Sequence, residues 1–337
     1  MSTTTSRRSA RRILATTVAL GATAALLTAC STSSDTTTSS DTTTKPAAAP
    51  SPARPRVGII LGGGGESGVA WETAVLSALA DKADLTRKNV DVVVGTSAGA
   101  IAGAYYSAVD DLHPVVEAQR AGKGISAPVP SSGADNPIPK EMIAALSSTE
   151  GTIEERGKRI GALAIKAKTP IASKDLVGYV ASALPGKDWP AFDFRPTSVN
   201  AETGKTVLWQ KSDGVPLAAA VASSAAVPGF LPAVEINGQH YTDAPRTTFS
   251  ADLVKEKNLD AIVYIGMPTP TLSNTVEEEA LTKLEAQGLK VVRITGGQGT
   301  DKLIKEALNP KIKPLAVQLG LRDGDDAATN VAALLNH

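Results

Sequence analysis

Runs of apolar residues that predict buried strands alternate along the chain with segments whose apolar positions recur at helical spacing. In chain order the pattern predicts a strand at 56–61, a helix at 69–80, a strand at 90–94, a helix at 100–109, a strand at 261–267, a helix at 275–287, a strand at 289–295, and helical stretches from 300 onward. Strands that alternate with helices at both ends of the chain predict a three-layer α/β/α sandwich with a mainly parallel central sheet.

The middle of the chain follows a different pattern. Residues 110–139 are rich in proline and glycine and predict a loop. Helical spacing then predicts three helices, at 141–146, 153–167 and 174–183, and an apolar helix at 215–225. Alternating apolar and polar positions predict a strand pair at 196–203 and 205–211. A hairpin that turns at Asn237-Gly238 is predicted at 234–241. Two interpretations of the three helices stay open, a lid over a site and an ordinary packing layer.

The strand at 90–94 leads into the pentapeptide Gly95-Thr96-Ser97-Ala98-Gly99, and small helix-forming residues follow at once. This pattern predicts a nucleophile elbow, a sharp turn from strand to helix that exposes a serine hydroxyl. Glycine fits both flanking positions because the turn leaves no room for Cβ atoms. Ser97 is therefore the candidate nucleophile.

The strand at 56–61 runs into the glycine-rich stretch Gly62–Gly68, for which two interpretations compete. One is a dinucleotide-binding turn, since the stretch satisfies G-x-G-x-x-G after a strand. The other is a loop of backbone N–H groups that stabilises an oxyanion. A dinucleotide site needs a carboxylate after the second strand, where this chain has Ser97. The sequence therefore favours the oxyanion loop.

A third stretch with chemical potential lies at 222–232, with the sequence Ala-Ser-Ser-Ala-Ala-Val-Pro-Gly-Phe-Leu-Pro, and the predicted hairpin follows it. Asp243 comes just after the returning strand, where a carboxylate can act as a base. His240 offers a rival Ser-His-Asp mechanism, but strand alternation puts it on the opposite face from Asp243. Asp243 is therefore the preferred candidate base.

Composition limits the classes of function. The chain has 337 residues, of which 42% are hydrophobic and 20% charged, as in globular proteins. Lys+Arg and Asp+Glu both number 34, so no excess of basic residues indicates binding to nucleic acid.

The N-terminus predicts export. Four arginines within residues 7–12 precede an apolar run at 13–27 that is too short to span a bilayer comfortably. Leu27-Thr28-Ala29-Cys30 resembles the bacterial lipobox, so residues 1–29 are predicted to be a lipoprotein signal peptide and Cys30 the lipidated residue. The anchor would hold the protein on the outer face of the bacterial cytoplasmic membrane. The export route, general or twin-arginine, stays open.

Residues 30–55 consist almost entirely of Ser, Thr, Asp, Ala and Pro and predict a disordered tether. The hydrolase-like domain is then expected at 56–337. Cys30 is the only cysteine, so no disulfide can form within the chain. Loss of residues 1–29 removes four arginines and no acids, which leaves a formal excess of about four negative charges.

Four ordered elements together resemble the patatin-like phospholipase family over about residues 56–267: the glycine-rich loop, the Gly95–Gly99 elbow, the 222–232 stretch and Asp243. The resemblance implies hydrolysis of acyl esters of lipids by a Ser-Asp dyad, without a metal or another cofactor. It implies that Ser97 is acylated, that Asp243 is the general base, and that the N–H groups of Gly63, Gly64, Gly65 and Ala98 form the oxyanion hole.

Two positions depart from the pattern that the resemblance implies. Ser67 stands where the family usually has arginine, and Ala244-Pro245 follows Asp243 where the family usually has glycine. These departures motivate an alternative from another class, a lipid-binding lipoprotein that retains the fold with little turnover. The sequence gives no indication of oligomeric state.

Overall fold

The structure is a computed structural model, and it describes residues 54–124, 138–245, 250–268 and 272–336. The predicted signal peptide, the predicted lipidation residue Cys30 and most of the predicted tether lie outside the described residues. The last part of that tether is described, and there the Arg54 guanidinium forms an ion pair with Asp91, 2.9 Å away.

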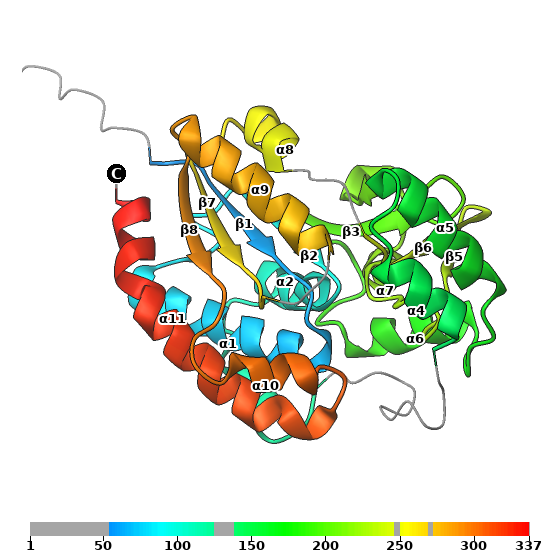
Figure 1. Cartoon of the computed structure of the whole chain (residues 1–337). Helices are drawn as coiled ribbons and strands as arrows, with labels where there is room; N and C mark the ends of the chain where they lie inside the picture. The colour runs from blue at the N-terminus through cyan, green and yellow to red at the C-terminus, as the bar shows by residue number, and fades with distance from the viewer. Residues whose placement is uncertain (1–53, 125–137, 246–249, 269–271, 337) are drawn as a thin grey trace, which may run out of the picture. The chain divides into compact units, whose positions relative to one another are not determined.

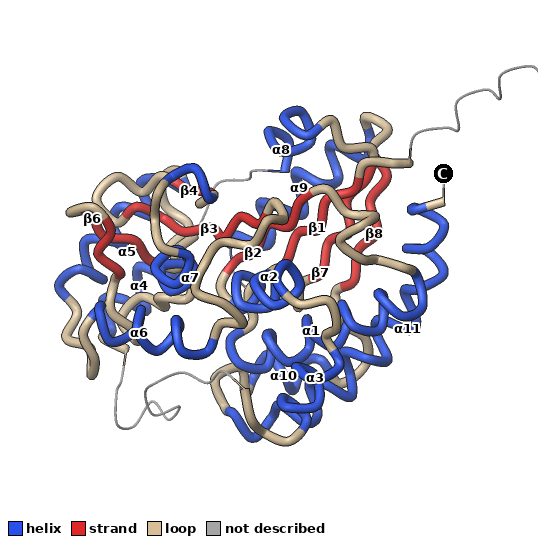
Figure 2. Tube along the Cα trace, turned by 180° about the vertical axis from the view of Figure 1, so that it is seen from behind, coloured by secondary structure: helices blue, strands red, loops and turns tan. Residues whose placement is uncertain are grey.

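The described strands form one mixed sheet in the order β5-β6-β3-β2-β1-β7-β8, with β4 paired to β3 (Figure 2). Their bounds are β1 Val57–Leu61, β2 Val92–Thr96, β3 Phe194–Asn200, β4 Thr206–Leu208, β5 Val234–Ile236, β6 Gln239–Thr242, β7 Ala261–Ile265 and β8 Lys290–Ile294. Strands β3, β2, β1, β7 and β8 pair in parallel, whereas β4 and β6 are antiparallel to β3, and β5 to β6.

Helices cover both faces of the parallel strands, so the predicted three-layer sandwich is confirmed (Figure 1). One layer holds α1 Gly65–Ala83, α2 Ala98–Ala108, α3 His113–Arg120, α10 Thr300–Lys305 and α11 Lys313–Leu335; the other holds α8 Ser250–Lys257 and α9 Leu272–Ala286. Along β1, Ile59 and Leu61 belong to the core of the first layer and Ile60 to that of the second. Both faces of β1 are buried, which explains why this strand is a continuous apolar run.

The antiparallel end of the sheet carries its own helices, α4 Lys140–Ser147, α5 Ile153–Lys166, α6 Ser173–Ala183 and α7 Leu217–Ser224 (Figure 1). Helices α4 and α5 pack against this end through a small core that includes Met142, Ile160 and Val199. Helices α4 and α5 therefore form an ordinary packing layer, which was one of the two interpretations of the predicted helices; the other was a lid. Helix α6 differs, because Leu176 and Val180 join the main core.

Two helices were not predicted, and one begins earlier than predicted. Helix α3 lies inside the predicted 110–139 loop, and Pro114 is in its first turn, where proline needs no hydrogen-bond donor. Helix α8 has only eight residues and a weak apolar pattern. Helix α1 begins at Gly65 rather than at 69, so the second half of the glycine-rich stretch is helical. Glycine is a poor helix former, which hid this start.

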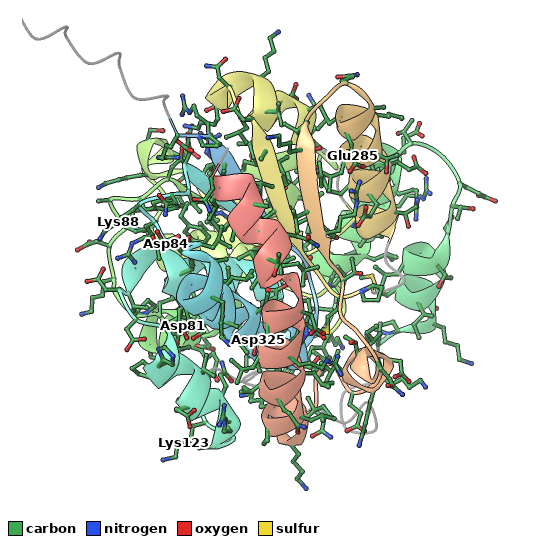
Figure 3. The ribbon with its side chains drawn as sticks, turned by 90° about the vertical axis from the view of Figure 1, so that its left-hand side faces the viewer. Asp81, Asp84, Lys88, Lys123, Glu285 and Asp325 are labelled. Atoms are coloured by element: carbon green, nitrogen blue, oxygen red, sulfur yellow. The ribbon has the colours of Figure 1, made fainter. Side chains whose placement is uncertain are left out.

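Helix α11 lies along α1, as Figure 3 shows, with Asp325 on α11 and Asp81 near the end of α1. The two backbones approach closely at Gly320, where an added Cβ would lie 2.4 Å from the carbonyl oxygen of Trp71. The Trp71 indole N–H also donates to Asp323, 2.8 Å away. Packing and this buried hydrogen bond together fix the C-terminal helix against the first one.

Glu72 on α1 is fully buried, and neither of its carboxylate oxygens has a hydrogen-bond partner among the described residues. Burial raises the pKa of the Glu72 carboxyl well above its usual range. In the unfolded chain this carboxyl ionises near its ordinary pKa, of about 4.3. Above that pH the folded state binds more protons than the unfolded state, so the free energy of unfolding falls as pH rises toward the raised pKa.

We therefore expect Glu72→Met to increase the free energy of unfolding at pH 8 by about 1–3 kcal/mol, because it removes an unsatisfied buried acid. The gain should shrink toward pH 4. Urea unfolding at both pH values measures it. Glu72→Gln is the matched control: its amide cannot titrate but is also unsatisfied, so it should remove the pH dependence without the full gain. A gain for Glu72→Met that is equal at both pH values would contradict this account.

Candidate active site

Ser97 lies between the end of β2 and the start of α2, in the predicted arrangement of strand, turn and helix. Its backbone has φ 55° and ψ −114°, outside the regions that side chains normally allow, and the residue is only 8% exposed. Strain of this kind persists only where the surrounding structure enforces it, and it gathers at functional sites. Ser97 is thus held in a nucleophile-elbow conformation.

The two glycines of the elbow are required by close backbone contacts. A Cβ at Gly95 would lie 2.3 Å from the carbonyl oxygen of Gly99, and one at Gly99 would lie 2.6 Å from that of Gly62. The Gly99 N–H donates to the Gly62 carbonyl, 2.9 Å away. This bond joins the turn that carries Ser97 to the glycine-rich loop after β1, the neighbouring parallel strand.

Ser224, the last residue of α7, holds the elbow from the other side. Its hydroxyl oxygen accepts a hydrogen bond from the Ser97 backbone N–H, 2.9 Å away, and Ser224 is fully buried. The sequence indicates chemical potential in the 222–232 stretch but predicts no role for Ser224. The available signal was a pair of serines in an otherwise apolar helix.

The glycine-rich loop lies next to Ser97. A Cβ built on Gly63 would be 3.6 Å from the Ser97 Cβ, and one on Gly68 would be 2.9 Å from the Ala98 Cβ. Of the hydrogen bonds among the described residues, none uses the N–H groups of Gly63, Gly64, Gly65 and Ala98. Gly65 and Ala98 are the first residues of α1 and α2, where helix dipoles favour negative charge.

Asp243 follows β6 and is half-buried. Its backbone N–H donates to the Ala226 carbonyl, 2.9 Å away, and the Thr242 hydroxyl donates to the same oxygen. Since Ala226 is two residues after Ser224, the end of the hairpin is tied to the segment that holds Ser97. Among the described residues no hydrogen bond joins the Ser97 hydroxyl to the Asp243 carboxylate.

His240, the rival candidate, has a different neighbour. Its ring Nδ1 lies 2.8 Å from a carboxylate oxygen of Glu202, and its backbone N–H donates to the same carboxylate. No hydrogen bond among the described residues joins His240 to Ser97 or Asp243. The geometry therefore favours the outward-facing position that strand alternation predicts.

Ser67, which stands where an arginine was expected, is fully buried. Its hydroxyl lies 2.9 Å from the Leu303 carbonyl of α10 and 3.1 Å from the Gly64 carbonyl, and it can donate to one of them at a time. Ser67 therefore links the glycine-rich loop to α10 through the hydrogen bond of its hydroxyl. It brings no charge to the site.

A mainly apolar cavity of about 70 Å³ adjoins Ser97. It is lined by residues of α1, α2, α6, the segment after α7 and the segment before α11, namely Gly65, Glu66, Val69, Ser97, Ala98, Ile101, Leu176, Tyr179, Val180, Ala225, Val227, Phe230, Leu231 and Leu308. Ser97 and two of the proposed oxyanion residues thus share one cavity. Asp243 is not among the described residues that line it.

Glu66, the acidic residue that lines the cavity, forms an ion pair with Lys313 of α11. The Glu66 carboxylate lies 3.5 Å from the ammonium of Lys313, whose side chain is fully buried. Burial lowers the pKa of Lys313, and the nearby Glu66 opposes that shift. The sequence alone does not predict this ion pair, because the two residues are 247 positions apart.

The described residues contain no group of three or more His, Cys, Asp and Glu side chains placed to hold a metal ion. None of the described helices is both long enough and apolar enough to cross a membrane.

Two solved structures are similar to this chain: the type III effector protein ExoU, at 15% identity and a TM-score of 0.35, and the ExoU–SpcU complex of Pseudomonas aeruginosa, at 14% identity and a TM-score of 0.30. They cover 82% and 80% of this chain, which spans about half of their length, 54% and 52%. No curated protein matches the chain.

The sequence model of the patatin-like phospholipase family matches residues 59–244, more than half of the chain. The match includes the glycine-rich loop, the elbow, the segment after α7 and Asp243. The chain belongs to the patatin-like phospholipase family.

Proposed function

We propose that this protein is a serine acyl hydrolase that cleaves carboxylic esters of lipids, with Ser97 as nucleophile and Asp243 as general base. One observation carries the proposal. Ser97 occupies a strained position at the start of α2, at the edge of an apolar cavity, and the backbone N–H groups beside it have no hydrogen-bond partner among the described residues.

In the proposed reaction Asp243 accepts the proton of the Ser97 hydroxyl while Oγ attacks the ester carbonyl carbon. The N–H groups of Gly63, Gly64, Gly65 and Ala98 stabilise the negative oxygen of the tetrahedral intermediate; one such donor is typically worth about 10²–10³ in kcat. The intermediate collapses, the C–O bond to the alcohol breaks, and Asp243 returns the proton to that alcohol. Water then attacks the acyl-serine by the same steps in reverse.

A carboxylate is a weak base in water, because its ordinary pKa is about 3.9 for aspartate. The dyad therefore needs a site from which substrate has displaced water; of its two residues, Ser97 is the one that lines the mainly apolar cavity. Catalytic hydrogen bonds are often long without substrate and tighten in the substrate complex. We propose that the bond between Ser97 and Asp243 forms in this way.

The second candidate, a lipid-binding lipoprotein with little turnover, is favoured by one observation: no hydrogen bond among the described residues joins Ser97 to Asp243. Multiple turnover separates the two. With a hundredfold excess of an acyl ester over enzyme, we expect continuous release of the acid, whereas a binding protein would release at most one equivalent. A single equivalent followed by no further release would exclude the hydrolase.

A second part of the proposal concerns residues 1–55, which we propose export and anchor the protein. We propose that cleavage after residue 29 leaves Cys30 lipidated, and that residues 30–55 tether the domain at 56–337 to the outer face of the cytoplasmic membrane. Mass spectrometry of the mature N-terminal peptide tests this, because lipidation adds acyl mass to Cys30. A peptide that begins with unmodified Cys30, or one that retains residues 1–29, would exclude it.

Ser224→Ala is expected to lower kcat about tenfold with little change in KM, because the elbow amide of Ser97 loses the acceptor that holds it in its strained position. Steady-state kinetics on one ester measures this. Ser223→Ala is the matched control: Ser223 is equally buried and bonds to Trp209 and Ala220 rather than to Ser97. Equal losses of kcat in both variants would show that the effect is not specific to Ser97.

A further inference from the structure

Lys313, the first residue of α11, brings a buried cation to the start of α1. Its ammonium lies 3.5 Å from the carboxylate of Glu66 and donates to the backbone carbonyl of Lys123, 3.5 Å away. The side chain of Lys313 is fully buried, and that of Glu66 is 8% exposed. Two charges removed from water in this way are costly to bury, so each depends on compensation by the other.

Glu66 brings a negative charge into the cavity that Ser97 lines. It follows Gly65, whose N–H group is one of the proposed oxyanion donors, and it lines the same cavity as Ser97. Negative charge develops there when the Ser97 hydroxyl attacks an ester carbonyl. A second negative charge in the same cavity repels the first, and burial strengthens the repulsion. A carboxylate in this place therefore needs a compensating cation.

Helix α10 and the segment after it lie next to the start of α1 and hold it in place (Figure 1). The Ser67 N–H donates to the Ala307 carbonyl, 3.2 Å away, and the Ser67 hydroxyl lies 2.9 Å from the Leu303 carbonyl. A Cβ on Gly65, where φ is 62°, would lie 2.6 Å from the Ala307 carbonyl oxygen. All of these partners lie beyond residue 244, where the match to the family ends. The loop beside Ser97 thus depends on a part of the chain that the family match does not include.

We propose that Lys313 is a positioning residue for the proposed hydrolysis: its ammonium holds the Glu66 carboxylate and cancels a charge that would otherwise oppose the oxyanion. The inference rests on the proposed function, because an oxyanion forms only if Ser97 attacks an ester. Lys313 is not among the described residues that line the cavity, so it acts through Glu66 rather than on the substrate. A neutral ester becomes negative only in the transition state, so the effect belongs to kcat rather than to KM.

The test is the hydrolysis of p-nitrophenyl butyrate, a neutral ester, by the full chain, with kcat and KM measured separately. Lys313→Met should lower kcat at least about tenfold and change KM less than about threefold, because it leaves the Glu66 carboxylate uncompensated. Adding Glu66→Gln to Lys313→Met should restore kcat to within about threefold of the wild type, because the repelling charge is then removed as well. Lys311→Met is the matched control, since Lys311 is exposed and only two residues away, and it should leave both constants unchanged.

A merely structural role of Lys313 gives a different result. If Lys313 only held α11 in place, the double variant would lose at least as much kcat as Lys313→Met. That result overturns the inference and leaves the hydrolase intact, as does a kcat for Lys313→Met within about threefold of the wild type.

The double variant also decides the case in which circular dichroism shows Lys313→Met alone to be unfolded, because it buries neither charge. A kcat for the folded double variant within about threefold of the wild type then supports the inference, and a larger loss overturns it. No hydrolysis by the wild type overturns the proposed function and this inference together.

Discussion

Replacing Ser97 by alanine is expected to lower kcat/KM on an acyl ester by about 10⁴-fold or more, because the nucleophile is removed while the oxyanion donors and the cavity remain. The residual rate then comes from binding and transition-state stabilisation alone. Steady-state kinetics on the wild type's preferred ester measures the loss. Ser107→Ala is the matched control, since Ser107 is a buried serine on α2, the helix that follows Ser97, and does not line the cavity.

Asp243→Asn should lower kcat by about 10³- to 10⁴-fold, because the amide cannot accept the proton of the Ser97 hydroxyl. The amide has nearly the same shape, so circular dichroism and thermal unfolding should stay close to the wild type. Full activity in Ser97→Ala and Asp243→Asn together would remove the dyad from the account. Full activity in Asp243→Asn alone would leave the nucleophile and remove the base.

A large effect on stability is expected at Gly320, where α11 packs closely along α1. An added methyl group would lie 2.4 Å from the Trp71 carbonyl oxygen and 2.8 Å from the Ala74 Cβ, so the helices must separate. Gly320→Ala should therefore lower the free energy of unfolding by about 2–3 kcal/mol, although alanine favours helix by about 1 kcal/mol. Urea unfolding at one pH measures the difference.

Gly178→Ala is the matched control for that substitution. Gly178 is in the middle of α6, and nothing lies within 4 Å of an added Cβ. The same change should therefore stabilise the protein by up to about 1 kcal/mol, through helix propensity alone. Stabilisation at both positions would contradict the close approach of α1 and α11.

The parts of the fold that could be predicted are those that a short, continuous stretch of sequence determines. Strands β1, β2 and β7 are buried along nearly their whole length, so each is a continuous apolar run with a helix after or near it. The hairpin β5–β6 turns at Asn237-Gly238, and both residues have positive φ, 52° and 76°. Helices α3 and α8 were missed because each has eight residues and buries only two of them.

The parts of the candidate site that could be predicted are those formed by a single short motif. The elbow at Ser97 and the loop at Gly62–Gly68 could be recognised because steric demands fix glycine at set positions. Ser224 and Lys313 could not be recognised. Their contacts with Ser97 and Glu66 span 127 and 247 positions, and no local pattern marks a residue as the partner of another so far along the chain.

The central claim is that Ser97 is an activated nucleophile that lines a mainly apolar cavity. Its most direct test is intact and peptide mass spectrometry after treatment with a fluorophosphonate, which modifies only activated serines. The account predicts one adduct per chain, on the peptide that contains Ser97, and none in Ser97→Ala. No adduct on the folded wild type, or an adduct on another serine that persists in Ser97→Ala, would contradict it.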